Sequence, residues 1–81
     1  MIRLHILSFS LVKDALGKKN IIITMDNNVT VKQLLKKVRA MNNQKLDGLP
    51  IRVAVNQLYV NENHILCNED QVALIPPVSG G

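Results

Sequence analysis

The chain has 81 residues, the length of one small domain with little room for a deep catalytic cleft. Only 2% of the residues are aromatic (Phe9 and Tyr59), which argues against an exposed platform of rings for stacking nucleic-acid bases. The formal net charge is +4, but only Lys18–Lys19 and Lys36–Lys37 are adjacent, a pattern that favours a solvated surface over an anion site.

The N-terminal part of the chain predicts two strands with a short helix between them. Met1–Phe9 becomes apolar on both faces near its end, which indicates a strand inside a sheet. Ser10 is expected to cap a short helix that runs to Leu16 and stops at Gly17. The β-branched run in Asn20–Met25 predicts the second strand.

The main helix is predicted after a turn at residues 26–28. Thr30 and Gln33 match a capping box, in which each side chain bonds the backbone N–H of the other residue. The helix is expected to end near Met41, before the Asn42-Asn43 pair. Apolar residues at helical spacing predict its core face: Val31, Leu34, Leu35, Val38 and Met41.

Three further strands are predicted in the C-terminal part of the chain. Ile51–Val55 and Leu58–Val60 flank Asn56-Gln57, which is expected to form a hairpin turn. Gln71–Ile75 is the last strand. Strands at both ends of the chain with one main helix between them indicate an α+β domain, a mixed sheet of about five strands packed on that helix.

The tail Pro76–Gly81 differs in composition from the rest of the chain. The Pro76-Pro77 pair has no N–H to give to a sheet and has a fixed φ, so it ends the strand and begins a stiff, extended exit. No charged side chain follows Asp70, and Gly80-Gly81 has no Cβ, so it fits a narrow channel. The tail thus presents one charge, the Gly81 carboxylate, which ATP can convert to an acyl-adenylate that sulfur or an amine attacks.

The ending Asp70–Gly81 (DQVALIPPVSGG) resembles the C-terminus of the small subunit of molybdopterin synthase, the MoaD family. Val53–Gln57 resembles that family's hairpin segment, and the resemblance covers the whole chain. It implies a ubiquitin-like β-grasp domain over residues 1–75 and a flexible tail over residues 76–81. Asn68-Glu69 stands where the family often has an Asp-Gly type turn, and Asn68 is expected to take the left-handed conformation that this turn needs.

The resemblance implies a sulfur carrier that is no enzyme on its own. An enzyme of the ubiquitin-activating type (the MoeB class) adenylates Gly81 with ATP, and Gly81 then becomes a thiocarboxylate. Its sulfur goes to cyclic pyranopterin monophosphate inside a heterotetramer with the large synthase subunit. The tail residues implied to enter that subunit are Pro76, Pro77, Val78, Ser79 and Gly80.

An apolar patch is predicted around the start of the tail. Leu7, Phe9 and Ile75 are its candidate residues, and they lie either at a partner interface or in the core.

The single cysteine and the two histidines are expected to have structural rather than catalytic roles. Cys67 is expected to be a small buried residue rather than a sulfur relay, beside Ile65 and Leu66, which point inward. His5 is expected on the sheet face opposite the helix, and His64 in a solvated loop. One cysteine without metal-ligand spacing predicts no metal site and no disulfide, and we expect no permanently bound cofactor.

Several alternatives share parts of these features. The Gly-Gly ending also fits a sulfur carrier for thiamine thiazole, cysteine or tRNA thiolation, and a ubiquitin-like modifier joined to lysines through Gly81. The net charge alone would fit a nucleic-acid-binding module, although we expect no nucleic-acid partner. With one cysteine, no signal peptide and no apolar run near the ~20 residues of a membrane span, a cytoplasmic location without membrane attachment is expected.

Overall fold

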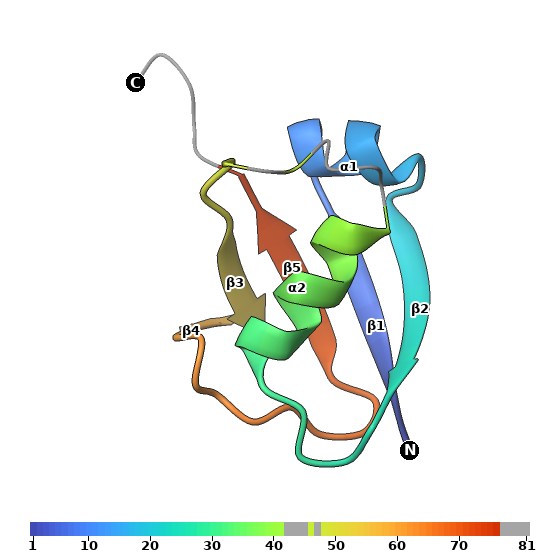
Figure 1. The fold of residues 1–81 in the computed structure, drawn as a ribbon, viewed down its shortest axis with the longest axis vertical. Coiled ribbons are helices and arrows are strands. Elements are labelled where there is room, and N and C mark those ends of the chain that lie inside the picture. The colour runs from blue at the N-terminus through green and yellow to red at the C-terminus, as the bar shows by residue number, and fades with distance from the viewer. Residues whose placement is uncertain (42–45, 47, 77–81) are drawn as a thin grey trace.

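The computed structural model describes residues 1–41, 46 and 48–76, and Figure 1 shows the arrangement of their helices and strands. In chain order the elements are β1 (Ile2–Ser8), α1 (Ser10–Leu16), β2 (Asn20–Met25), α2 (Val31–Ala40), β3 (Arg52–Val55), β4 (Leu58–Val60) and β5 (Gln71–Ile75). The predicted order of elements is confirmed. None of the helices in the described ranges has the length and apolarity needed to cross a membrane.

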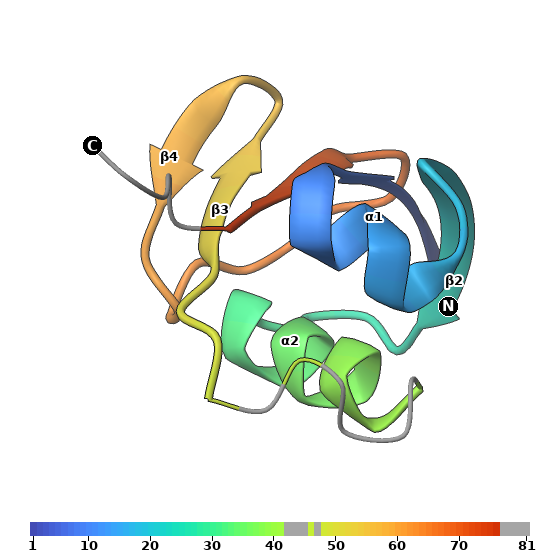
Figure 2. The ribbon, with the colours of Figure 1, turned by 90° about the horizontal axis from the view of Figure 1, so that it is seen from above.

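All five strands form one mixed sheet in the order β2-β1-β5-β3-β4. β1 pairs antiparallel with β2 and parallel with β5, so the first strand lies inside the sheet as predicted. β5 is central, because β3 pairs with its other side. Figures 1 and 2 show α2 along one face of the sheet and α1 at one end of it. We call the opposite side, which no described helix covers, the open face.

The core lies between the sheet and the helices, and it is aliphatic. Alternate side chains of the strands are buried against the apolar stripe of α2, as the period of a strand requires. Val72 and Leu74 of β5 are fully buried, so the strand that leads into the tail is fixed by its own core side chains. The largest fully buried side chains are Leu4, Ile6, Leu34, Leu46, Leu66 and Leu74.

The capping box at the start of α2 is confirmed. The Gln33 N–H donates to Thr30 Oγ1 at 3.3 Å, and the Thr30 N–H donates to Gln33 Oε1 at 2.8 Å. Most of the predicted stripe is buried: Val31, Leu34, Leu35 and Val38. The prediction is wrong for Met41, which is exposed. Met41 is the C-cap, beyond the last helical residue Ala40, so the helical spacing that buries the stripe ends before it.

The predicted cap of α1 is also wrong. Phe9, with the extended φ of −134°, is the N-cap and makes no side-chain capping bond, and Ser10 is already helical. Only one residue joins β1 to α1, so the extended backbone that an N-cap requires falls on Phe9. Gly17 ends the helix at a left-handed φ of 79°, as predicted.

The β3–β4 hairpin turns at the predicted pair. Asn56 and Gln57 have φ values of 50° and 74°, the two left-handed residues of a type I′ turn. In the following segment Leu66 is buried, as predicted, but Ile65 is 54% exposed. Ile65 forms an isolated bridge with Thr30, and neighbouring side chains of extended backbone point to opposite sides. The inward prediction is therefore right for only one of the two.

The turn before β5 uses a different residue from the one predicted. Glu69, not Asn68, has the left-handed φ, at 70°. Asn68 Oδ1 instead accepts the Arg3 N–H at 2.7 Å, and the Glu69 N–H donates to the Arg3 carbonyl, also at 2.7 Å. These two bonds join the turn to the start of β1 and fix the turn in this form.

Candidate functional site at the root of the tail

The candidate site is the C-terminal end of β5, where the tail begins. Ile75 pairs with Arg52 of β3, and Leu74 pairs with Ser8 of β1. Pro76 follows directly and is buried. The tail therefore starts from a strand that is held on both sides, a position we call the tail root. The remaining predicted site residues lie outside the described residues: Pro77, Val78, Ser79, Gly80 and Gly81.

The neighbouring end of β1 is fixed by a buried serine. Ser8 is the one buried polar residue of the described chain. Its hydroxyl donates to the Lys18 carbonyl at 2.6 Å, and its N–H donates to the Lys19 carbonyl at 2.8 Å. These bonds hold the α1–β2 connection against β1, while Val12 of α1 is fully buried in the core. The tail root is thus part of the rigid domain.

The three predicted patch residues lie at the tail root, outside the core. Leu7 and Ile75 are half-buried, Phe9 is 39% exposed, and none belongs to the core cluster. The side chains of Leu7 and Ile75 alternate with buried ones, which places them on the open face. Ser8 pairs with Leu74, so the same register brings Phe9 beside Ile75. The structure brings the three together, and their role as an interface stays a prediction.

The patch extends further across the sheet than the sequence indicated. Leu7 pairs with Ala73, Ala73 with Ala54, and Ala54 with Tyr59, which gives one row on the open face. The alternation of side chains along each strand could have predicted which face each residue lies on. Which residues are neighbours across the strands depends on the pairing registers, and no local sequence pattern contains these. We define the open-face patch by six residues, of which Ala54 is covered by its neighbours at 6% exposure: Leu7, Phe9, Ala54, Tyr59, Ala73 and Ile75.

One cation, Arg52, borders the open-face patch beside the tail root. The Arg52 guanidinium lies over the Tyr59 ring, with 4.3 Å between Cζ and the ring centroid. This cation–π contact holds the Arg52 charge close to the apolar row. Small alanines in the middle and larger side chains around them make a shallow surface, which suits docking of a protein rather than enclosure of a small molecule.

A polar cluster lies at the other end of the open face. Arg3 Nε donates to Glu69 Oε1 at 2.8 Å, and His5 Nε2 lies 2.7 Å from Glu69 Oε2. The hydrogen bond from His5 and then that from Arg3 lower the pKa of Glu69 below its ordinary value. His5 lies on the face opposite α2, as predicted. Its contact with Glu69 gives it a structural role, because it joins β1 to the β4–β5 connection.

The structure also places the two remaining candidate side chains, Cys67 and His64. Cys67 is exposed, so the prediction of a buried thiol is wrong. Its N–H donates to Asp70 Oδ2 at 2.7 Å, and this turn directs the side chain outward. His64 is half-buried rather than fully solvated. Among the residues that the structure describes, no group of three His, Cys, Asp or Glu side chains could hold a metal ion.

Comparison with known proteins identifies a close relative in sequence. The chain is 35% identical over 80 residues to the molybdopterin synthase sulfur carrier subunit of Dictyostelium discoideum, with 94% of this chain and 93% of the relative covered. The resemblance stated from the C-terminal motif is therefore confirmed over nearly the whole length.

Solved structures share the fold at lower identity. A Pyrococcus furiosus protein assigned as molybdopterin converting factor subunit 1 matches with a TM-score of 0.88 at 19% identity, covering 96% of this chain and 100% of that one. Small archaeal modifier protein 1 of Haloferax volcanii matches at 0.84 and 18%, covering 96% and 100%. A complex of subunits 1 and 2 of molybdopterin-converting factor from Helicobacter pylori matches at 0.69 and 24%, covering 99% and 100%.

These matches confirm the predicted ubiquitin-like β-grasp fold, with its mixed sheet on one main helix. A family model matches residues 9–81, which includes the tail root and the whole tail. The chain belongs to the ThiS family.

Proposed function

We propose that this chain is the sulfur carrier small subunit of a molybdopterin synthase. The observation that supports this most strongly is the 35% identity to the Dictyostelium sulfur carrier subunit across 94% of the chain. The architecture of the tail root supports it independently. A tail that starts from a central, doubly paired strand is presented at a fixed point, which suits insertion into a partner's active site.

The chemistry belongs to the C-terminal carboxylate. An oxygen of the Gly81 carboxylate attacks the α-phosphate of ATP, and the bond to pyrophosphate breaks. A hydrosulfide equivalent from the sulfur donor then attacks the acyl carbon, AMP leaves, and Gly81 carries a thiocarboxylate. The activating enzyme binds the ATP and catalyses this step, and a separate donor provides the sulfur, so this chain needs no nucleophile–base pair of its own.

The partner in this proposal is the large synthase subunit. The open-face patch adjoins the tail root, so a protein that receives the tail would also cover Leu7, Phe9 and Ile75. The Helicobacter complex contains subunits 1 and 2 of molybdopterin-converting factor, and its match supports an assembly of this kind. A heterotetramer with two small subunits on a large-subunit dimer is the assembly we propose.

The test is reconstitution from purified components. The chain is incubated with its adenylating enzyme, ATP and a sulfur source, then mixed with the large subunit and cyclic pyranopterin monophosphate. We expect molybdopterin to form, and to fail with a chain lacking Gly81. Sulfur loading without molybdopterin formation, but with transfer to a thiazole synthase or a tRNA-thiolating enzyme, would reassign the carrier to another pathway.

A second function, protein modification, is favoured by one observation. The Haloferax small archaeal modifier protein shares the fold over 96% of this chain. A modifier uses the same acyl-adenylate but transfers Gly81 to a lysine amine. Isopeptide-linked species that disappear on deletion of Gly81 would support this function. Their absence in cells that make molybdopterin would reject the modifier function and keep only the carrier function.

A further inference from the structure

The outer edge of β2 forms one end of the sheet. In the sheet order β2 has a single neighbour, β1, and Figures 1 and 2 show no labelled element beyond it. The unpaired N–H and C=O groups of such an edge can pair with another strand. The edge therefore has open hydrogen-bonding capacity within the described chain.

The register fixes which backbone groups face outward. The Ser8 N–H donates to the Lys19 carbonyl, so residue 19 forms a hydrogen-bonded pair with β1. Pairs of this kind alternate along an antiparallel ladder, so Ile21 and Ile23 also bond inward. The backbone groups of Asn20, Ile22 and Thr24 consequently point away from the sheet.

The two edges of the sheet differ in how they are protected. β4 is only three residues long, which is one way in which proteins limit edge pairing. β2 is six residues long, pairs with β1 in an unbroken register without a bulge, and contains no charged residue, proline or glycine. Its central Ile22 is 60% exposed on the open face. β2 lacks the usual protective devices.

We propose that two copies of this chain associate through their β2 edges into one continuous sheet. In an antiparallel pair about a two-fold axis at Ile22, the outward groups of Ile22 bond those of Ile22 of the second copy. Asn20 then bonds Thr24 of the second copy, so all three outward residues find partners. The proposal does not depend on the proposed function.

This register is the one that matches the charges at the ends of the strand. Lys18 and Asp26 lie just beyond the two ends of β2, and this register would bring Lys18 near Asp26 of the second copy at both ends of the strand pair. Both side chains are exposed, and neither forms an ion pair within the described chain. A shift of the register by one residue in either strand breaks this match. Opposite charges at facing positions stabilise a strand pair and select its register.

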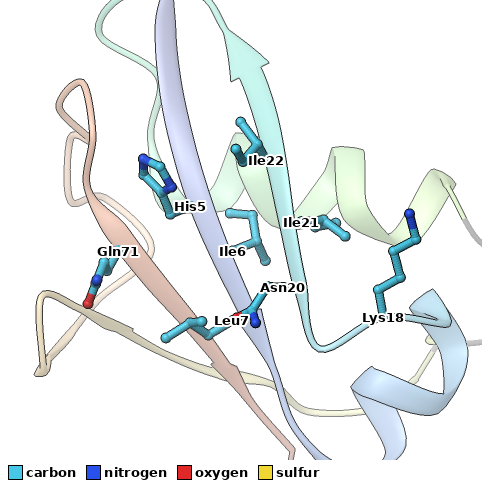
Figure 3. A pocket seen from close by; sticks show the side chains of 8 residues that line it. All are labelled: His5, Ile6, Leu7, Lys18, Asn20, Ile21, Ile22 and Gln71. Carbon is cyan, nitrogen blue, oxygen red and sulfur yellow. The ribbon is translucent and has the colours of Figure 1, made fainter.

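The same register brings apolar side chains together on both faces. Ile22 and its pairing partner His5 both line a shallow groove (Figure 3). Across the axis Ile22 would contact Ile22 of the second copy. On the core side, half-buried Ile21 would face Ile23 of the second copy and lose more of its exposed surface. The tail root is not used, because β1 separates β2 from β5.

The first test is the mass of the full-length chain by sedimentation equilibrium over a range of concentrations. We expect a reversible monomer–dimer equilibrium, and Ile22→Lys should weaken it at least about tenfold, since it places two like charges on the axis. Leu58→Lys is the matched control, because Leu58 is 72% exposed on the opposite edge strand. Mass that stays monomeric at all concentrations, or a dimer that only Leu58→Lys disrupts, would overturn the proposal.

The register is tested by charge reversal. Lys18→Asp and Asp26→Lys should each weaken the dimer roughly three- to tenfold, and the double variant should restore it, because it exchanges the partners of both pairs. A double variant weaker than either single variant would contradict the register.

Amide hydrogen exchange gives an independent readout. Exchange at Ile22 and Thr24 should slow as protein concentration rises, while Ile21 and Ile23 are protected by β1 at every concentration. Concentration-independent exchange at Ile22 under conditions that give a dimer would place the interface elsewhere and overturn the proposal.

Discussion

Glu69 carries the clearest electrostatic perturbation of any described residue. Its turn conformation, with φ of 70°, brings the carboxylate between His5 and Arg3. Hydrogen bonds from His5 and Arg3 favour the ionised form and lower its pKa in the folded chain. A carboxyl group whose folded pKa is depressed contributes stability above its unfolded pKa, and this contribution is lost as pH falls through the folded pKa.

We therefore expect the Glu69 carboxyl carbon to titrate by NMR with a midpoint below 4.5, its ordinary value. Removing the first partner with His5→Ala should raise this midpoint, and Arg3→Ala should raise it too. Lys36→Ala, an exposed charge on α2, is the control and should leave it unchanged. A Glu69 midpoint equal to 4.5 in the unmodified chain would refute this account of the cluster.

The free energy of unfolding should likewise fall as pH drops through the folded pKa of Glu69. Glu69→Gln should lose the part of the pH dependence that lies at acidic pH, because no proton binds at residue 69 in either state. Urea unfolding at neutral and acidic pH measures it. If the slope of stability against pH is identical in the two chains, the Glu69 contacts are not maintained in solution.

At the scale of elements, the start of α2 depends on one side-chain cap. Thr30→Ala removes the bond from the Gln33 N–H to Thr30 Oγ1 and should lower the free energy of unfolding by about 1 kcal/mol. Thr30→Ser keeps the hydroxyl and is the matched control. Denaturant unfolding of the three chains tests this, and equal losses for alanine and serine would show that the cap contributes nothing.

The β3–β4 hairpin carries backbone strain at Gln57, which has a φ of 74°. A glycine at this position adopts the left-handed region freely and gives the Asn-Gly pair that type I′ turns favour. We expect Gln57→Gly to raise the free energy of unfolding by about 0.5–1 kcal/mol, the strain relieved less the added entropy of the unfolded chain. A thermal melt checks this. Gln57→Ala keeps the strain and should give no gain.

The elements themselves could be predicted from the sequence because their signals are local. The Thr30–Gln33 box, the stripe from Val31 and the Asn56-Gln57 turn are each complete within a few residues. The error in the turn before β5 arose because a distant contact decides which residue is left-handed there. Glu69 rather than Asn68 takes the left-handed conformation because the turn bonds Arg3, which is 66 positions away in the chain.

At the scale of the whole molecule, the sheet order joins the tail root to the open-face patch. The sequence predicted Leu7, Phe9 and Ile75, but it missed Ala54, Ala73 and Tyr59. An alanine in a sequence does not by itself indicate that the residue belongs to a binding surface. The place of these three residues in the row follows only from the pairing of β1, β5, β3 and β4. The chemistry of the tail, in contrast, was visible in the sequence because it needs only the order of the last residues.

The open-face patch should contribute to partner binding without supporting the fold. Leu7→Asp should weaken binding to the large synthase subunit at least about tenfold, since a charge is buried in an apolar contact. The free energy of unfolding should change little, because Leu7 lies outside the core. Ile65→Asp, an exposed position off the sheet, is the control for calorimetric titration. Unchanged binding by Leu7→Asp would exclude the patch from the interface.

The most direct test of the carrier function is the intact mass of the chain after incubation with its adenylating enzyme, ATP and a sulfur donor. We predict a gain equal to the replacement of one oxygen by one sulfur, located at Gly81 by fragmentation. A chain lacking Gly81 should gain no mass and should unfold at the same temperature as the full-length chain. An unmodified Gly81 under conditions that load a control carrier, or sulfur transfer by the truncated chain, would contradict the proposed function.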